Sequence, residues 1–233
     1  MKKILYSTTI LASFMFTSIN VSATTNKDGG IPFDSSIVNG GVDTETKLIN
    51  PGFKISPRAP KPKQVILKIP FQTQKTDYYC GPASASMIVK SLGYNKNQDQ
   101  MAGLLGTTKN GTNAGNGVAN ALNSVVKGSK YKFNWEWHTY NHVDKMKNHI
   151  KEALSWGNPV MVNTMESPGD VYIQGHNIGT TLYHYGIVGD YFDNGNQVTY
   201  VDPGHGRYRG FLMNQKVSIK NMSYATGGRG YAW

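Results

Sequence analysis

The stretch that decides the fold reads Gln74-Lys-Thr-Asp-Tyr-Tyr-Cys80-Gly-Pro-Ala-Ser84. Pro82 suits the first turn of a helix and Gly93 suits the position just after a helix end, so the sequence predicts a helix that begins beside Cys80. The unpaired N–H groups and partial positive charge at a helix N-terminus stabilise a thiolate. Gln74 lies one short loop upstream, where its amide could donate a hydrogen bond to an oxyanion formed beside the sulfur. This arrangement indicates a nucleophilic cysteine.

Cys80 is the single cysteine among the 233 residues, so it forms no disulfide within this chain. Three interpretations follow: an interchain bridge, a buried apolar residue, or a reactive thiol. The predicted helix start beside the sulfur favours the reactive thiol.

A cysteine nucleophile needs a base within hydrogen-bond reach, and the base usually needs an orienting group. His184 stands near the start of an apolar segment, residues 183–191, that predicts a buried strand. An imidazole in such a place must find a partner or lie at a cleft. Asp202 ends the next predicted strand, residues 197–201, and pairing of the two strands as a hairpin would bring both residues to one end of the sheet. His184 is the predicted base and Asp202 the predicted orienting group.

Other histidines offer alternatives. His176 and His205 lie in glycine-rich loops near the predicted site, and either could replace His184 as the base. His138 and His142 are four residues apart, a spacing that could place two metal ligands on one helix face, but no acidic residue is spaced to complete a zinc site. We expect no metal and no organic cofactor.

The chain divides into three predicted parts. Residues 1–23 have a basic start, a short apolar stretch and Val-Ser-Ala at the end, which predicts a signal peptide cleaved after Ala23. Residues 24–63 are rich in glycine and proline and lack hydrophobic periodicity, which is typical of a linker or pro-segment. Residues 64–233 are long enough for one domain with its own core.

These features predict a secreted protein, either extracellular or associated with the cell wall. No stretch after the signal peptide is long enough to span a membrane, so we expect no transmembrane segment in the mature chain. The formal net charge of +10 favours anionic partners such as cell-surface polymers. Because the lysines and arginines are scattered, we expect no specific nucleic-acid partner.

The order of predicted elements in residues 64–233 indicates an α+β domain, since helices dominate first and strands later. Hydrophobic spacing and turn residues predict the boundaries. The predicted helices cover residues 81–92, 98–105, 118–126 and 143–154, and the predicted strands cover 65–69, 132–140, 159–162, 183–191 and 197–201.

The order of the candidate residues resembles that of the bacterial C39-like cysteine peptidases of the papain-like superfamily. Gln74 comes first, followed by Cys80-Gly-Pro, by His184 before an apolar strand, and by Asp202-Pro. The resemblance extends over nearly all of residues 64–233. It implies a papain-like fold, with an N-terminal catalytic-cysteine helix and further helices packed on a C-terminal antiparallel β-sheet. It also implies Cys80 as nucleophile, His184 as general base and acid, Asp202 as orienting group and Gln74 as oxyanion donor.

The best-known relatives are leader-peptide-cleaving domains fused to transporters, whereas this sequence shows neither transporter spans nor a phosphate-binding loop. We therefore expect a stand-alone exported cysteine peptidase that acts on a peptide or protein through a thioester intermediate. One alternative is a papain-like acyltransferase or a hydrolase of cell-wall cross-bridge peptides. An alternative of another class is a non-catalytic exported binding or toxin-like module with a vestigial triad.

Overall fold

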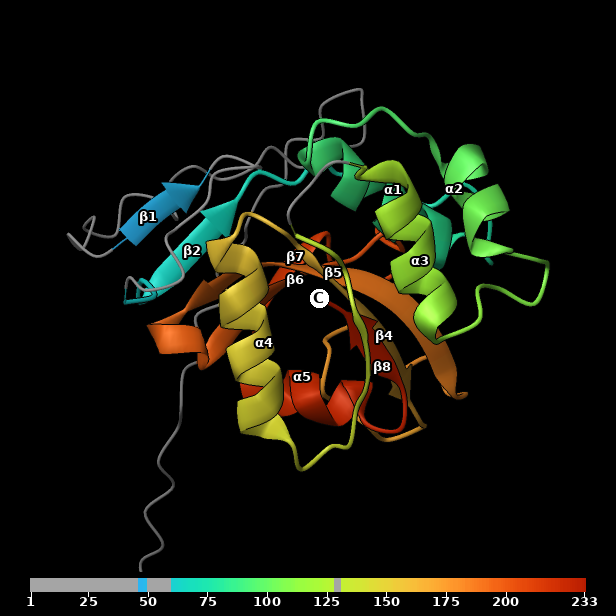
Figure 1. Ribbon diagram of the computed structural model, residues 1–233. Helices are drawn as coiled ribbons and strands as arrows, with labels where there is room; N and C mark the ends of the chain where they lie inside the picture. The colour runs from blue at the N-terminus through green and yellow to red at the C-terminus, as the bar shows by residue number, and fades with distance from the viewer. Residues whose placement is uncertain (1–45, 50–59, 128–130) are drawn as a thin grey trace, which may run out of the picture. The chain divides into compact units, whose positions relative to one another are not determined.

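The computed structural model describes residues 46–49, 60–127 and 131–233 (Figure 1). The predicted signal peptide, its cleavage position and most of the predicted linker lie outside these residues. The helices are α1 (Cys80–Ser91), α2 (Gln98–Leu105), α3 (Asn116–Val125), α4 (Val143–Ser155) and α5 (Ile219–Thr226). The strands are β1 (Thr46–Ile49), β2 (Gln64–Leu67), β3 (Trp135–Trp137), β4 (Val160–Glu166), β5 (Leu182–Phe192), β6 (Gln197–Val201), β7 (Asn214–Ser218) and β8 (Gly230–Ala232).

These strands form one sheet in the order β1-β2-β5-β4-β8-β3, and β6 pairs with both β5 and β7. The neighbours run antiparallel except β1 and β2, which are parallel. β5 is the longest strand and contacts three others: β4 along its first half, and β2 and β6 along its second half. Residues near the start of β5 therefore lie close to the end of β6, where Asp202 follows.

Helices cover both faces of the sheet (Figure 1). The side chains of Val160 and Val162 on β4 belong to a core with α4 and α5. Met161, between them, belongs to a second core with α1, α2 and α3. This alternation explains why β4 begins with a continuous apolar run, residues 160–162, because a strand buried on both faces has no polar side there.

The structure is the mixed α/β fold that the sequence predicts, with the antiparallel sheet following the first helices. The predicted helices all form within a few residues of their expected ends. The segment 132–140 gives a shorter strand than predicted, β3, because only three of its residues pair with β8. Strand β1 lies inside the segment interpreted as a linker or pro-segment.

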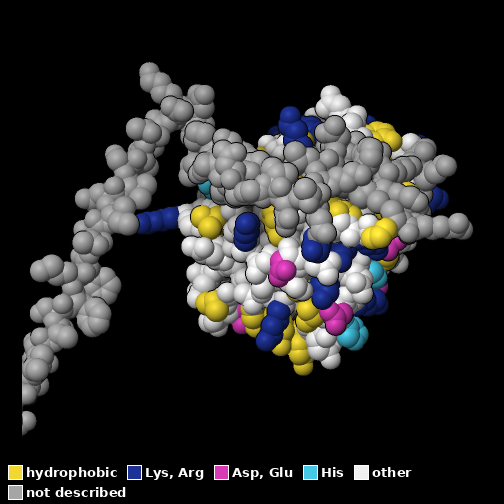
Figure 2. All heavy atoms as spheres, turned by 90° about the vertical axis from the view of Figure 1, so that its left-hand side faces the viewer, with side chains coloured by type: hydrophobic (Ala, Val, Ile, Leu, Met, Phe, Trp, Pro, Cys, Tyr) yellow, Lys and Arg dark blue, Asp and Glu magenta, His cyan; other side chains and the backbone are white. Residues whose placement is uncertain are grey.

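Charged side chains are mixed on the surface. Figure 2 shows one face on which lysine and arginine side chains are interspersed with acidic and uncharged ones. Among the described residues, none of the helices has the length and apolar character that crossing a membrane requires.

Candidate active site

Cys80 is the first residue of α1 and is almost buried, with 8% of its surface exposed. Burial raises the pKa of its thiol. The hydrogen bond and charge of His184, together with the backbone N–H groups of Tyr185 and Gly81, lower that pKa by more than burial raises it. The net pKa of Cys80 is lowered, so the site favours the thiolate, which is the nucleophilic form.

The residue after the cysteine is a glycine because another loop comes very close. A Cβ atom on Gly81 would lie 2.3 Å from Oγ1 of Thr112. Thr112 is held in turn by Thr107, whose Oγ1 lies 2.7 Å from its own. The loop that carries Thr112 therefore packs directly on the start of α1, and a larger residue at position 81 would displace it.

His184 and Asp202 form a buried hydrogen-bonded pair. Nε2 of His184 lies 2.7 Å from Oδ1 of Asp202, and the same oxygen accepts the backbone N–H of Gly204 at 2.7 Å. The pairing of β5 with β6, in which Ile187 faces Val201, brings the two residues to one end of the sheet. Because Nε2 faces Asp202, the other ring nitrogen is left for the Cys80 thiol.

The contact between His184 and Asp202 shifts the pKa of both side chains towards their charged forms. Burial lowers the pKa of His184, but Asp202 and Cys80 raise it by more, to about 10. Burial raises the pKa of Asp202, but His184 and His176 hold it well below its usual range. These contacts favour an imidazolium at His184, between the Cys80 sulfur and the Asp202 carboxylate.

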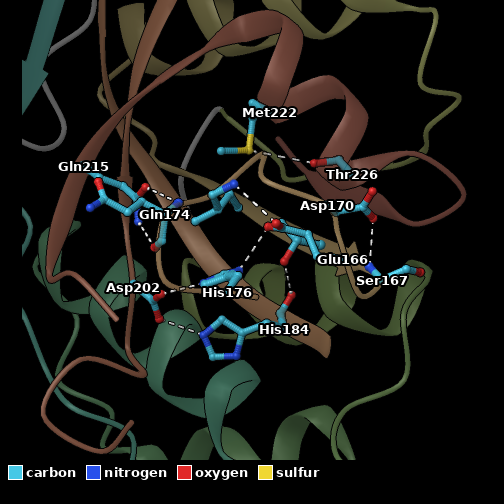
Figure 3. Close-up of polar contacts among 12 residues, drawn as sticks. Glu166, Ser167, Asp170, Gln174, His176, His184, Asp202, Gln215, Met222 and Thr226 are labelled. Carbon is cyan, nitrogen blue, oxygen red and sulfur yellow. Dashed lines mark hydrogen bonds and ion pairs between the residues drawn. The ribbon is translucent and has the colours of Figure 1, made fainter. Parts of the chain in front are cut away.

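A second buried histidine lies behind this pair (Figure 3). Nε2 of His176 lies 2.8 Å from Oδ2 of Asp202, and Nδ1 lies 3.2 Å from Oε1 of Glu166. The sequence pointed to His176 as an alternative base, and the structure instead places it on the far oxygen of Asp202. Glu166 was not singled out, since a carboxylate at a strand end carries no motif that would distinguish it.

Gln74 is buried beside the loop that follows Asp202. Its backbone N–H donates to the carbonyl of Pro203 at 2.8 Å, and its Nε2 donates to the carbonyl of Thr76 at 2.8 Å. That bond uses one hydrogen of the side-chain NH₂ group, which has two. The role of Gln74 as oxyanion donor stays a prediction that would use the second hydrogen.

A cavity of about 490 Å³ opens beside Cys80. Its walls carry aromatic, amide, hydroxyl and small side chains, and one basic side chain, Arg229. The lining residues are Cys80, Asn110, Gly111, Thr112, Asn113, Ala114, Trp137, Asn163, Tyr183, Tyr185 and Arg229. Cys80 therefore lies at the wall of a pocket large enough for several residues of a peptide.

The remaining histidine candidates lie elsewhere. Nδ1 of His205 contacts the carbonyl of Phe211 at 2.8 Å, and Nε2 of His138 contacts Oγ of Ser223 at 2.7 Å. In the part of the chain that the structure describes, the one cluster with ligand atoms close enough for a metal ion is His176, His184 and Asp202, within 4.8 Å of one another. In this cluster, Nε2 of His184 and Nε2 of His176 each contact one carboxylate oxygen of Asp202.

The fold and the site define an α+β protein with a buried cysteine–histidine–aspartate cluster. The chain belongs to the Peptidase_C39 like family, whose model matches residues 66–226. Membership in this family indicates a peptidase. A search of curated proteins found no match.

Several solved structures are similar to this chain. One is the peptidase domain of Streptococcus ComA, a bifunctional ABC transporter involved in quorum sensing, which is 19% identical to this chain. The alignment covers 69% of this chain and 93% of the ComA domain, with a TM-score of 0.46. A protein described as a C39-like peptidase from Bacillus anthracis is 15% identical, with coverages of 72% and 96% and a TM-score of 0.48. A double-glycine-motif protease from an AMS/PCAT transporter, in complex with its leader peptide, is 16% identical, with coverages of 71% and 91% and a TM-score of 0.43.

Proposed function

We propose that this protein is an exported cysteine peptidase that hydrolyses peptide bonds through Cys80, His184 and Asp202. The observation that carries the proposal is the buried contact of His184 with Asp202 on one side and with the Cys80 thiol, whose pKa is lowered, on the other. Membership in the Peptidase_C39 like family supports it.

The proposed reaction has two halves: formation of a thioester on Cys80 and hydrolysis of that thioester. The Cys80 thiolate attacks the scissile carbonyl carbon, and the resulting oxyanion accepts a hydrogen bond from Gln74. His184 gives its proton to the leaving amine as the C–N bond breaks, which leaves a thioester on Cys80 and a neutral imidazole. A water molecule then gives a proton to His184 and attacks the thioester, which releases the acid and regenerates the ion pair.

Asp202 keeps the His184 ring in place and stabilises its charge during these steps. Its second oxygen contacts His176, which in turn lies at Glu166. These buried contacts fix the orientation of the carboxylate, and the fixed carboxylate holds the His184 ring beside the sulfur.

The proposal of an exported location rests on the sequence of residues 1–23, and an anionic cell-surface polymer remains a proposed partner on the basis of net charge. Secretion and cleavage after Ala23 are checked by sequencing the N-terminus of the protein recovered from the culture medium of a secreting host.

Activity is tested by incubating the protein with a diverse peptide mixture and identifying the products by mass spectrometry. The proposal predicts free carboxyl products with the wild type and none with Cys80→Ala. Products that carry added hydroxylamine in preference to water would indicate acyl transfer instead. No product of either kind, with an unreactive thiol, would indicate a non-catalytic module.

A further inference from the structure

One basic side chain lines the cavity next to the nucleophile. Arg229 lies between α5 and β8, and the cavity wall around it contains no aspartate or glutamate. In the part of the chain that the structure describes, no carboxylate lies within ion-pair distance of its guanidinium. An arginine in such a place is an available site for an anionic group.

The guanidinium is held in position by two contacts. Its Nε donates to Oδ1 of Asn163 at 2.6 Å, and its Cζ lies 4.9 Å from the centre of the Tyr183 ring. Asn163 is 1% exposed and also donates, through Nδ2, to the carbonyl of His184 at 3.2 Å. The same amide therefore positions the arginine and contacts the strand that carries the base.

Within the described residues, these contacts leave the two terminal nitrogens of Arg229 unused, since Asn163 occupies Nε alone. Terminal guanidinium nitrogens bind a carboxylate through two parallel hydrogen bonds. Gly228 has a φ of 72°, a left-handed conformation that glycine adopts without strain, and this turn directs the chain so that Arg229 reaches the cavity wall.

We propose that Arg229 is a specificity-determining residue, which binds a carboxylate of the substrate close to the scissile bond. The inference rests on the proposed function and names its substrate class: peptides with a carboxylate within one or two residues of the bond that is cut. That carboxylate comes either from an acidic side chain or from a free C-terminus. Trp137 and Tyr183, which are 59% and 56% exposed, form the aromatic walls on which the adjoining residues pack.

A first experiment needs no peptide. Iodoacetate and iodoacetamide alkylate the same sulfur and differ in that iodoacetate carries a carboxylate. The ratio of the Cys80 alkylation rates, iodoacetate over iodoacetamide, should fall roughly tenfold in Arg229→Gln, the loss expected for one charge-assisted hydrogen bond. Arg229→Lys, which keeps the charge but not the paired hydrogen bonds, should give a ratio between those of the wild type and Arg229→Gln.

Lys216→Gln is the matched control, because Lys216 is also a cation stacked on an aromatic ring, 4.7 Å from the centre of Phe192, but lies on β7 and not on the cavity wall. Its alkylation ratio should equal that of the wild type. An unchanged ratio in Arg229→Gln would overturn the proposal, and so would an equal fall in Arg229→Gln and Arg229→Lys.

A second experiment uses pairs of peptides that are identical except for glutamate against glutamine near the cleaved bond, or a free C-terminus against an amide. The wild type should cleave the charged member of one pair roughly tenfold faster, and Arg229→Gln should lose that preference. The pair that shows the preference identifies the source of the carboxylate. Cleavage of both peptides of every pair at the same rate would overturn the role of Arg229 but not the proposed peptidase activity. If no peptide were cleaved while the alkylation ratio still fell in Arg229→Gln, the proposed peptidase activity alone would be overturned.

Discussion

Two buried histidines contact the same sheet, and their surroundings favour the charged form of one and the neutral form of the other. His184, on β5, lies against the Asp202 carboxylate, which with Cys80 raises its pKa to about 10 despite burial. His138, which follows β3, lies against the Ser223 hydroxyl, and burial lowers its pKa to about 4. Both side chains are almost fully buried, at 2% and 4% exposure.

The difference shows that burial alone does not decide the charge of an imidazole. Burial disfavours the charged form at both positions, and a carboxylate within hydrogen-bond distance reverses the outcome at one of them. His138 also packs edge-on against Tyr231, and the opposing charges of Glu136 and Lys145 nearby change its pKa less than burial does. The first environment suits catalysis by an ion pair, and the second suits packing.

The largest expected effect separates the two histidines by activity. Cys80→Ala and His184→Ala should each lower kcat by roughly 10⁴-fold or more, because they remove the nucleophile and its base. His138→Gln should leave turnover unchanged. Steady-state rates with circular dichroism as a check of folding test this. Full activity in His184→Ala, with loss in His176→Ala or His205→Ala, would show that the base is another histidine.

Gln74→Ala should lower kcat by roughly 10²–10³-fold, the usual loss for one oxyanion donor. The Michaelis constant should change little, since the hydrogen bond is made mainly in the transition state. Gln98→Ala is a useful comparison, because Gln98 supports the same loop through the carbonyl of Thr73 and the N–H of Lys75 without reaching the sulfur. Equal losses in the two variants would point to loop structure instead of oxyanion binding.

Asp202→Asn should be milder, with a loss of about 10–10²-fold, because its amide oxygen still accepts the hydrogen bond of His184 while the charge is removed. Asp202→Ala should be slower than Asp202→Asn, and the acidic limb of the rate profile should shift in both. Rates measured across pH decide this. If neither variant differs from the wild type, Asp202 is a turn residue and the orienting group lies elsewhere.

The smallest expected effect is on stability and has opposite sign for the two histidines. The folded-state pKa of His138 is lowered from its usual 6.5 to about 4. Between these two pH values, His138 is protonated in the unfolded chain but not in the folded chain. The free energy of unfolding should therefore fall as the pH drops from 6.5 towards 4, by at most about 1.4 kcal/mol per pH unit from this group. His184, with its raised pKa, stabilises the fold below 6.5 and loses that contribution as the pH rises towards 10.

Urea unfolding of the wild type, His138→Gln and His184→Gln between pH 4.5 and 9 separates these contributions. His138→Gln should flatten the acid side of the stability profile, and His184→Gln should flatten the alkaline side. If both variants kept the wild-type dependence, other groups would control the pH response.

The sequence was most informative where local chemistry is distinctive. The segment from Gln74 to Pro82 predicted the helix start at Cys80, and the hairpin of 183–191 with 197–201 predicted that His184 and Asp202 lie near each other, as their 2.7 Å contact shows. Local signals are strong there because glycine, proline and strand alternation each have one dominant structural meaning.

Other features depended on contacts that sequence spacing does not encode. β7, α5 and β8 were not predicted; β8 has three residues, and its place between β4 and β3 comes from pairing across the chain. His176 contacts both Asp202 and Glu166, which lie on other segments of the chain. No local sequence pattern predicts such a contact. Arg229 lies within a glycine-rich stretch that carries no functional motif, and its place in the cavity wall comes from the fold.

Cys80 and His184 are proposed to form a thiolate–imidazolium pair. The rate of Cys80 alkylation by iodoacetamide as a function of pH, in the wild type and in His184→Ala, tests whether this pair exists. We expect a wild-type midpoint well below the value of about 8.5 for an ordinary thiol, and a higher midpoint in His184→Ala. A wild-type midpoint near 8.5, unchanged by His184→Ala, would rule out the pair and make Cys80 a structural cysteine.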